Sequence, residues 1–379
     1  MFKDLFKNYI YPVAVFAGGM IGVGFLSLPY IALQVGIWTM LLYFLVMTAL
    51  IIVVNLIFCE ISLKTPDFKR FPGFVGYYLG KPAQVFAMIS VILGTVGTLL
   101  VYLIVGGQFL TSVFQPIFSG NMLMYVCIYF IIASIIIFFD IKVVSKAEFW
   151  VVALLFLSVL FIFISGFSHI KISNILISNL KFQISNLFLP FAPLLFALWG
   201  IGLIPEVEEM LGKGKKSLKK IIAISTIIVS VFYLLFVFLI LGISGAKTNS
   251  MALNGLGDFL SGVFVPMALF AGVLATFTAF ITQGIIFKKT LVFDLKIKHW
   301  QAFVMTCCPP FILLLLGFNS FISIISFIGG VLLGINGILI LLMYKKIGGP
   351  GRAGKNIIIY LLSLVFLLGI IYEIIYFIK

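Results

Sequence analysis

The chain has 379 residues, of which 63% are hydrophobic and 9% are charged. Because soluble domains carry about 25% charged residues, this composition excludes a soluble globular domain and predicts an all-α integral membrane protein. The formal net charge of +14 does not indicate nucleic acid as a partner, because the basic residues lie in short loops between apolar segments, as expected beside a lipid bilayer.

About eleven apolar segments of the length of a transmembrane helix follow one another along the chain. They form a single transmembrane domain, in which two sets of five segments, over residues 10–167 and 187–344, precede one extra helix. The expected ranges are 10–33, 36–62, 83–114, 121–139, 146–167, 187–211, 220–244, 258–288, 300–317, 320–344 and 356–378.

Basic residues divide unevenly between loops on the two sides of the membrane. With the N-terminus in the cytoplasm, every lysine and arginine lies on the inner side except Lys171, Lys181, Lys247 and Lys379. Cytoplasmic loops of membrane proteins carry such an excess of positive charge. The sequence therefore predicts a multi-pass protein of the cell (plasma or inner) membrane with a cytoplasmic N-terminus and an external C-terminus.

The first segment contains an interruption. Gly18, Gly19, Gly22 and Gly24 lie close together, and Pro29 follows them. Each glycine costs a helix about 1 kcal/mol relative to alanine, and proline removes a backbone donor. At membrane depth a freed backbone group costs several kcal/mol unless protein or ligand satisfies it. A break here is therefore a candidate ligand site.

The next segments carry few polar side chains. The second ends at Glu60, near the predicted inner face, and the loop after it contains an aromatic stretch at residues 74–80 that is expected to form a short interfacial helix. Tyr102 lies in the third segment. These are the polar and aromatic groups of the first half that are candidates for a site.

The sixth segment repeats the pattern of the first and ends near Glu206. Gly200 and Gly202 correspond to Gly22 and Gly24, and each pair is followed by an apolar residue and a proline. Two interrupted segments at corresponding places in two halves point to a transporter binding site. The alternative explanation is that small residues merely allow helices to pack closely.

The eighth segment contains a run of hydroxyl groups at Thr276, Thr278 and Thr282, and Pro309 and Pro310 are expected to break the ninth. The four cysteines lie inside apolar segments, which is typical of small buried residues rather than of a disulfide or metal framework. No metal site, catalytic residue or cofactor is expected, apart from a coupling sodium ion or proton.

Two stretches resemble a known family. Residues 18–29 (GGMIGVGFLSLP) resemble the first-helix signature of amino acid/auxin permeases and aromatic amino acid permeases, and residues 195–200 (LFALWG) with 205–209 (PEVEE) resemble their sixth helix. The resemblance covers nearly the whole chain. It implies the LeuT-like fold of the amino acid–polyamine–organocation superfamily, a five-plus-five inverted repeat in which spans 1, 2, 6 and 7 rock against a scaffold of spans 3, 4, 8 and 9.

The resemblance further implies that an amino acid binds at the two breaks. Its carboxylate would accept hydrogen bonds from the N–H groups of Val23 and Gly24, and its ammonium group would donate to carbonyls freed at both breaks. The candidate substrate-binding residues are Ala17, Gly18, Gly22, Val23, Gly24, Tyr102, Phe196, Ala197, Trp199 and Gly200. Because neither break carries a charged side chain, a neutral, large apolar or aromatic L-amino acid is expected.

The coupling ion stays open between sodium and a proton. Sodium-coupled relatives bind the ion between span 1 carbonyls and span 8 hydroxyls. The matching positions here are Gly18, Ile21, Thr278 and Thr282. A glycine where these relatives often have asparagine disfavours sodium, and the fifth segment lacks the lysine of some proton-coupled relatives. Glu60 and Glu206 are the candidate proton sites.

The favoured function is therefore import of an amino acid by alternating access, coupled to a cation. An exchanger and a transporter-like amino acid sensor remain alternatives. A channel is less favoured, because the sequence has neither charged rings nor a repeated filter. An intramembrane enzyme is disfavoured because the only histidines, His169 and His299, fall in loops on opposite sides. The oligomeric state is not predicted.

Overall fold

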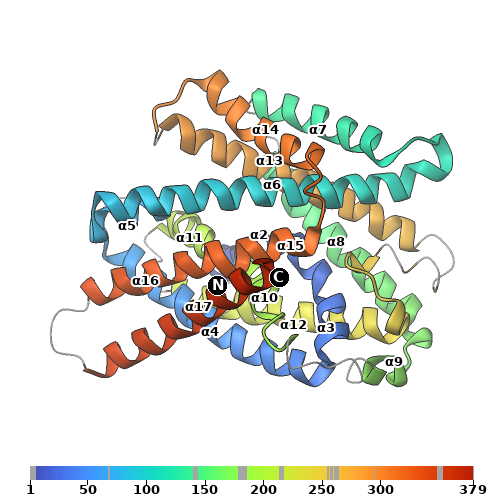
Figure 1. The fold of residues 1–379 in the computed structure, drawn as a ribbon, viewed down its shortest axis with the longest axis horizontal. Helices are drawn as coiled ribbons and strands as arrows, with labels where there is room; N and C mark the ends of the chain where they lie inside the picture. Colours follow the sequence, from blue (N-terminus) through green and yellow to red (C-terminus); the bar gives the residue numbers. More distant parts are fainter. Residues whose placement is uncertain are drawn as a thin grey trace.

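A computed structural model describes residues 6–66, 69–139, 144–177, 186–212, 217–253, 256, 259, 264–293, 295–347 and 353–378 (Figure 1). Within these ranges the regular structure is entirely helical. The main helices are α2 (Tyr11–Met20), η2 (Val23–Ser27), α3 (Leu28–Val35), α4 (Ile37–Lys64), α5 (Phe71–Leu79), α6 (Lys81–Phe118), α7 (Met122–Phe138), α8 (Val144–Gly166), α9 (Ile172–Ile177), α10 (Phe191–Leu198), η6 (Ile201–Leu203), α11 (Ile204–Leu211), α12 (Leu218–Ser244), α13 (Phe264–Phe293), α14 (His299–Leu315), α15 (Phe321–Ser326), η10 (Phe327–Leu333), α16 (Gly334–Ile347) and α17 (Ala353–Ile378).

The described helices account for all the predicted spans. Seven of them are long and apolar enough to cross a membrane, and the bent pair 8–20 and 23–35 makes an eighth. Three shorter apolar helices, at 122–138, 156–169 and 299–315, occupy the places of the predicted fourth, fifth and ninth spans. The short interfacial helix expected near residues 74–80 is α5. The prediction of an all-α membrane protein is thus confirmed.

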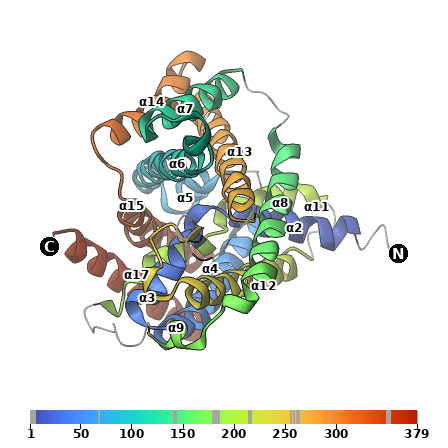
Figure 2. The ribbon, with the colours of Figure 1, turned by 90° about the vertical axis from the view of Figure 1, so that its right-hand side faces the viewer.

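The helices form two bodies, and the larger of two clusters of buried apolar side chains includes residues of both. In one body α6, α7, α13 and α14 pack on one another, and they enclose a separate cluster of buried side chains that includes Leu103, Tyr129 and Phe280. In the other, α12 packs on α2, α3 and α4, and both α10 and α11 contact α4. Figures 1 and 2 show the first body as a layer above the second. We call them the scaffold and the bundle.

Two helices differ from the sequence prediction. The expected break at Pro309 and Pro310 is wrong, because α14 continues through both prolines. Membrane helices tolerate proline because neighbouring helices, hydroxyl side chains and local adjustments of the backbone satisfy the freed carbonyl groups. The tenth span, predicted as a plain helix, contains the π-helical segment η10 between α15 and α16. Segments of this kind are rare and are frequent at functional sites.

Candidate functional site

The first span is interrupted at Ile21 and Gly22. The backbone of Gly22 is extended, with φ −105° and ψ −161°, and the flanking helical segments are bent by 53°. The Ile21 N–H donates to the carbonyls of Ala17 (3.1 Å) and Gly18 (3.2 Å). These two carbonyls are therefore engaged within α2. The N–H groups at the start of η2, from Val23 onward, have no acceptor within their own helix.

The second interruption lies at Trp199 and Gly200, between α10 and η6. Trp199 has an extended backbone (φ −72°, ψ 112°), and Gly200 has φ −114° and ψ 6°. A single 3-10 turn then leads into α11. The sequence prediction that the first and sixth spans are both broken is thus confirmed. The breaks lie at Gly22 and Gly200, the two glycines that correspond in the sequence pattern.

The two breaks lie against each other because their glycines have no side chains. A Cβ on Gly24 would stand 2.8 Å from Phe196 Cδ1 and 3.2 Å from Ala197 Cα. A Cβ on Gly200 would stand 2.8 Å from the ring of Phe16 on α2. Real Cβ atoms do not approach other atoms as closely as 2.8 Å. A side chain at either glycine would therefore push the first and sixth spans apart.

Tyr233 of α12 joins the two breaks. Its hydroxyl lies 3.1 Å from the Met20 carbonyl, at the end of α2, and 3.2 Å from the Ala197 carbonyl, near the end of α10. The side chain is fully buried, and its ring stacks on Phe25 with centroids 5.4 Å apart. One hydroxyl hydrogen is thus shared between a carbonyl from each broken span. Sequence reasoning missed this residue.

A small cavity adjoins the first break between the bundle and the scaffold. Its volume is about 20 Å³, which is room for about one water molecule. All of its lining side chains are uncharged. The lining consists of Ile21, Gly22, Val23, Phe25, Leu26, Tyr102, Phe109, Leu253, Gly272, Ala275, Thr276 and Ala279.

The structure divides the predicted substrate-binding residues into two groups. Gly22, Val23 and Tyr102 line the cavity. The remaining ones belong to the helix ends and to the contact between the breaks: Ala17, Gly18, Gly24, Phe196, Ala197, Trp199 and Gly200. Trp199 is partly buried and packs against the large apolar core rather than lining the cavity.

Of the predicted ion ligands, Ile21 lines the cavity and Thr278 is engaged within its own helix. Thr278 directs its hydroxyl to the carbonyls of Leu274 (3.1 Å) and Ala275 (3.2 Å) of its own helix. Thr276, and not Thr278 or Thr282, lines the cavity. Residues two apart on a helix point about 200° away from each other, so Thr276 and Thr278 face different neighbours.

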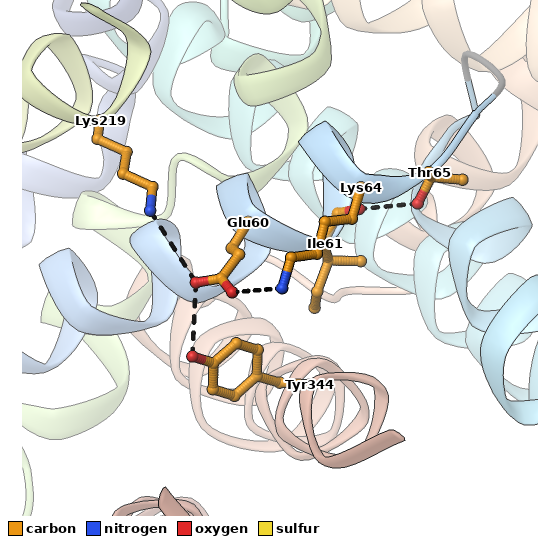
Figure 3. Close-up of polar contacts among 6 residues, drawn as sticks. All are labelled: Glu60, Ile61, Lys64, Thr65, Lys219 and Tyr344. Atoms are coloured by element: carbon orange, nitrogen blue, oxygen red, sulfur yellow. Dashed lines mark hydrogen bonds and ion pairs between the residues drawn. The ribbon is translucent and has the colours of Figure 1, made fainter. Parts of the chain in front are cut away.

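Glu60 lies at the end of α4 among partners from three helices (Figure 3). Lys64 Nζ is 2.8 Å from one carboxylate oxygen. Lys219 Nζ of α12 is 4.0 Å from the other, and the Tyr344 hydroxyl of α16 donates to the same atom at 3.5 Å. Exposed pairs of this kind contribute at most about 1 kcal/mol each. Glu60 thus connects α4, α12 and α16 at the lysine-rich end of the molecule.

Two of the three acidic residues of α11, Glu206 and Glu208, lie in different surroundings. Glu206, the second candidate proton site, is exposed. Glu208 is buried and accepts a hydrogen bond of 2.5 Å from the Ser62 hydroxyl of α4. Helix periodicity explains the difference, since residues two apart occupy different faces, but the sequence does not indicate which face is inward.

Asn55 of α4 is a polar residue that sequence reasoning also missed. It is fully buried, and neither atom of its amide has a hydrogen-bond partner. A Cβ on Gly200 would lie 3.4 Å from Asn55 Nδ2, so the amide lies beside the second break. Buried side-chain amides are normally hydrogen-bonded, and Asn55 is therefore available to a group that enters this region.

Comparison with known proteins agrees with this geometry. The structure is similar to that of MhsT in complex with L-phenylalanine, with a TM-score of 0.62 and 15% identity over 96% of this chain and 97% of that chain. It is also similar to that of Mhp1, a nucleobase-cation-symport-1 family transporter, in a closed conformation with bromovinylhydantoin bound, with a TM-score of 0.64 and 11% identity over 96% and 90%.

Both likenesses establish a common LeuT-type fold. No curated protein matches the sequence. The model of the tryptophan/tyrosine permease family, however, matches residues 7–375, almost the whole length. The chain is therefore a member of the tryptophan/tyrosine permease family.

Proposed function

We propose that this protein is a secondary active transporter that imports a neutral L-amino acid with a large apolar or aromatic side chain. The observation that carries the proposal is the pair of broken helices in direct contact, beside an uncharged cavity between bundle and scaffold. Membership of the tryptophan/tyrosine permease family supports the substrate class. The MhsT structure, which holds L-phenylalanine, is consistent with it.

The chemistry of the breaks explains how such a substrate would be held. The N–H groups of Val23 and Gly24 open η2, where the helix dipole favours a carboxylate. Carbonyls of Phe196 and Ala197, at the end of α10, would receive the ammonium group. The apolar cavity lining would accept the side chain. A cationic or anionic side chain would find no partner there and would lose its hydration.

Alternating access requires a movement at the contact between the bundle and the scaffold. The cavity has room for about one water molecule, so an amino acid requires the bundle and scaffold to separate at the first break. The scaffold has one apolar cluster of its own, but the larger cluster also contains scaffold residues such as Leu100 of α6 and Val273 of α13, so a shift of the two bodies repacks this shared contact. We propose that residues 10–167 and 187–344 are the inverted repeats that make this motion symmetric.

Uptake into proteoliposomes tests the proposed function. We expect accumulation of radiolabelled tryptophan, tyrosine or leucine, and competition among these three. Arginine and glutamate should not compete, because no charge lines the cavity. Binding without translocation would instead identify a sensor, and accumulation that no ion gradient drives would identify an exchanger. Equal competition by arginine would contradict the substrate class.

The direction of insertion has its own test. We propose a cytoplasmic N-terminus and an external C-terminus, because the basic residues collect on one side. Ser173 is exposed on α9, in the predicted external loop, and Lys220 is exposed at the start of α12 on the other side. A membrane-impermeant thiol reagent should label Ser173→Cys in intact cells and Lys220→Cys only after lysis. The reverse result would refute the orientation.

Coupling to a cation is part of the proposal, with sodium and proton as the alternatives. The sodium version uses carbonyls of Gly18 and Ile21 with Thr278 and Thr282. The Thr278 hydroxyl donates its hydrogen to its own helix, and its oxygen lone pairs could bind the ion. Uptake that depends on a sodium gradient and is lost in Thr278→Ala would support this version over a proton.

A further inference from the structure

Glu373 is a carboxyl group inside the protein without a hydrogen-bond partner. It lies on α17, the extra helix, which is located at the outside of the bundle (Figure 2). Its exposure is 0%, and neither carboxyl oxygen forms a hydrogen bond. An unpaired carboxylate at membrane depth is strongly unfavourable. The group is therefore stable in this packing only when it carries a proton.

The position of Glu373 on its helix is an inward one. Most of α17 is exposed, as expected of a helix that faces lipid, and its buried residues follow one stripe with alternating spacings of three and four. That stripe is Ile359, Leu362, Phe366, Gly369 and Glu373. The carboxyl group thus occupies a position at which the stripe predicts a buried apolar residue. Nearby positions of the same helix are exposed and could have carried a charge without burying it.

Two glycines of the π-helical segment η10 make room for this group and for α10. A Cβ on Gly330 would overlap Glu373 Cγ and would lie 3.1 Å from Ala192 Cβ. A Cβ on Gly329 would overlap the Ala192 carbonyl oxygen. Glu373 therefore packs through η10 onto the first turn of α10, and the other end of α10 is the second break.

Among the described residues, the neighbours of Glu373 include no group that would stabilise its ionised form. The described elements packed on α17 here, η10 and α10, carry no titratable or charged side chain. Tyr344, Lys345 and Lys346 lie at the opposite end of α16. Tyr372 and Tyr376 flank the residue on its own helix, and Tyr43 of α4 lies towards Tyr372. None of these three tyrosines carries a positive charge.

We propose that Glu373 is the proton-binding site that couples transport to a proton gradient; this rests on the proposed transport function. Loss of the proton to water leaves a charge that the present packing does not accommodate. Deprotonation therefore favours a conformation in which α10 has moved and water reaches the carboxylate, and protonation favours the packing seen here. By linkage, a movement of α10 that follows substrate binding changes the proton affinity of Glu373.

Infrared spectroscopy of the purified full-length protein tests the proton site without transport. We expect a carbonyl stretching band of a protonated carboxylic acid near neutral pH in the wild type. It should vanish in Glu373→Gln and remain in Glu209→Gln, a control because Glu209 is exposed on α11. A spectrum in which Glu373→Gln retains the whole band, or a wild type without it, would overturn the assignment.

Proteoliposomes with an alkaline interior test the coupling. With one proton per substrate, one pH unit supports at most about tenfold accumulation. Wild type and Glu209→Gln should approach this ratio, whereas Glu373→Gln should retain exchange but accumulate substrate only to equilibrium. Accumulation by Glu373→Gln equal to wild type overturns the coupling role. Absence of all substrate exchange in the wild type would remove the proposed function, while the infrared result would still decide the proton site.

A folding defect can be separated from these outcomes. Glutamine is isosteric with a neutral carboxylic acid, so Glu373→Gln should be as monodisperse and as stable to heat as the wild type. Glu373→Met, of similar volume and without a polar group, is the second variant. If both variants unfold, the native fold would depend on an ionised Glu373 that is paired with another group. That result would overturn the proposal.

Discussion

Gly24→Val is expected to reduce uptake to background. The first carbon of any side chain at position 24 meets Phe196 Cδ1 at 2.8 Å and the Ala197 backbone at 3.2 Å. A branched side chain would therefore push the two broken spans apart, and overpacking of this kind costs about 1–3 kcal/mol. It would also cover the η2 N–H groups proposed to hold the substrate carboxylate. Initial uptake rates, normalised to protein in the membrane, measure the effect.

The matched control for this variant is Gly202→Val. Gly202 belongs to the same glycine pattern in the sixth span, but a Cβ there has nothing within 4 Å. This variant should transport at close to the wild-type rate. Normal uptake by Gly24→Val, or an equal loss in both variants, would show that contact between the breaks does not matter.

Tyr233→Phe is expected to slow transport by up to about tenfold without loss of the fold. The substitution keeps the ring that stacks on Phe25 and removes the hydroxyl shared by the Met20 and Ala197 carbonyls. Loss of such a buried hydrogen bond costs about 0.5–1.5 kcal/mol, and 1.4 kcal/mol corresponds to a factor of ten. The two breaks would then no longer be held at a common distance. Uptake kinetics and thermal unfolding should be measured together.

Tyr125→Phe provides the comparison. The Tyr125 hydroxyl also donates to a backbone carbonyl, that of Ser119, at 2.5 Å, but in the turn between α6 and α7. Its removal should lower thermal stability by a similar amount and leave uptake unchanged. If Tyr125→Phe slowed transport as much as Tyr233→Phe, the effect would be one of general stability rather than of the breaks.

Much of the fold could be predicted from sequence because long apolar runs identify membrane helices. The seventh span, expected at 220–244, is α12 (Leu218–Ser244), and the break expected among the glycines 18–24 lies at Ile21 and Gly22. Both signals are local. Apolar length marks a span, and clustered glycine marks the place where a helix is weakest.

The parts that were missed depend on long-range packing. Tyr233, Asn55 and Glu373 each occupy the inward face of their helix, but a nearly uniform apolar sequence leaves that face undetermined. The π-helical segment η10 has no compositional signature, and the expected break at Pro309 ignored how helices in lipid tolerate proline. The candidate site was therefore predicted at its backbone breaks and at Tyr102, whereas Tyr233 and Asn55 were missed.

The composition of the scaffold core has a consequence for biosynthesis. Its buried side chains come from α6 and α7 in the first half of the chain and from α13 and α14 in the second. During translation, α6 and α7 enter the membrane long before their partners exist. A Cβ on Gly106 of α6 would meet both Tyr129 of α7 and Thr276 of α13. This surface of α6 is therefore not covered until α13 has been synthesised. Assembly of the scaffold is thus delayed until the ninth span has left the ribosome, and a nascent chain stalled before the eighth span holds α6 and α7 without their final core.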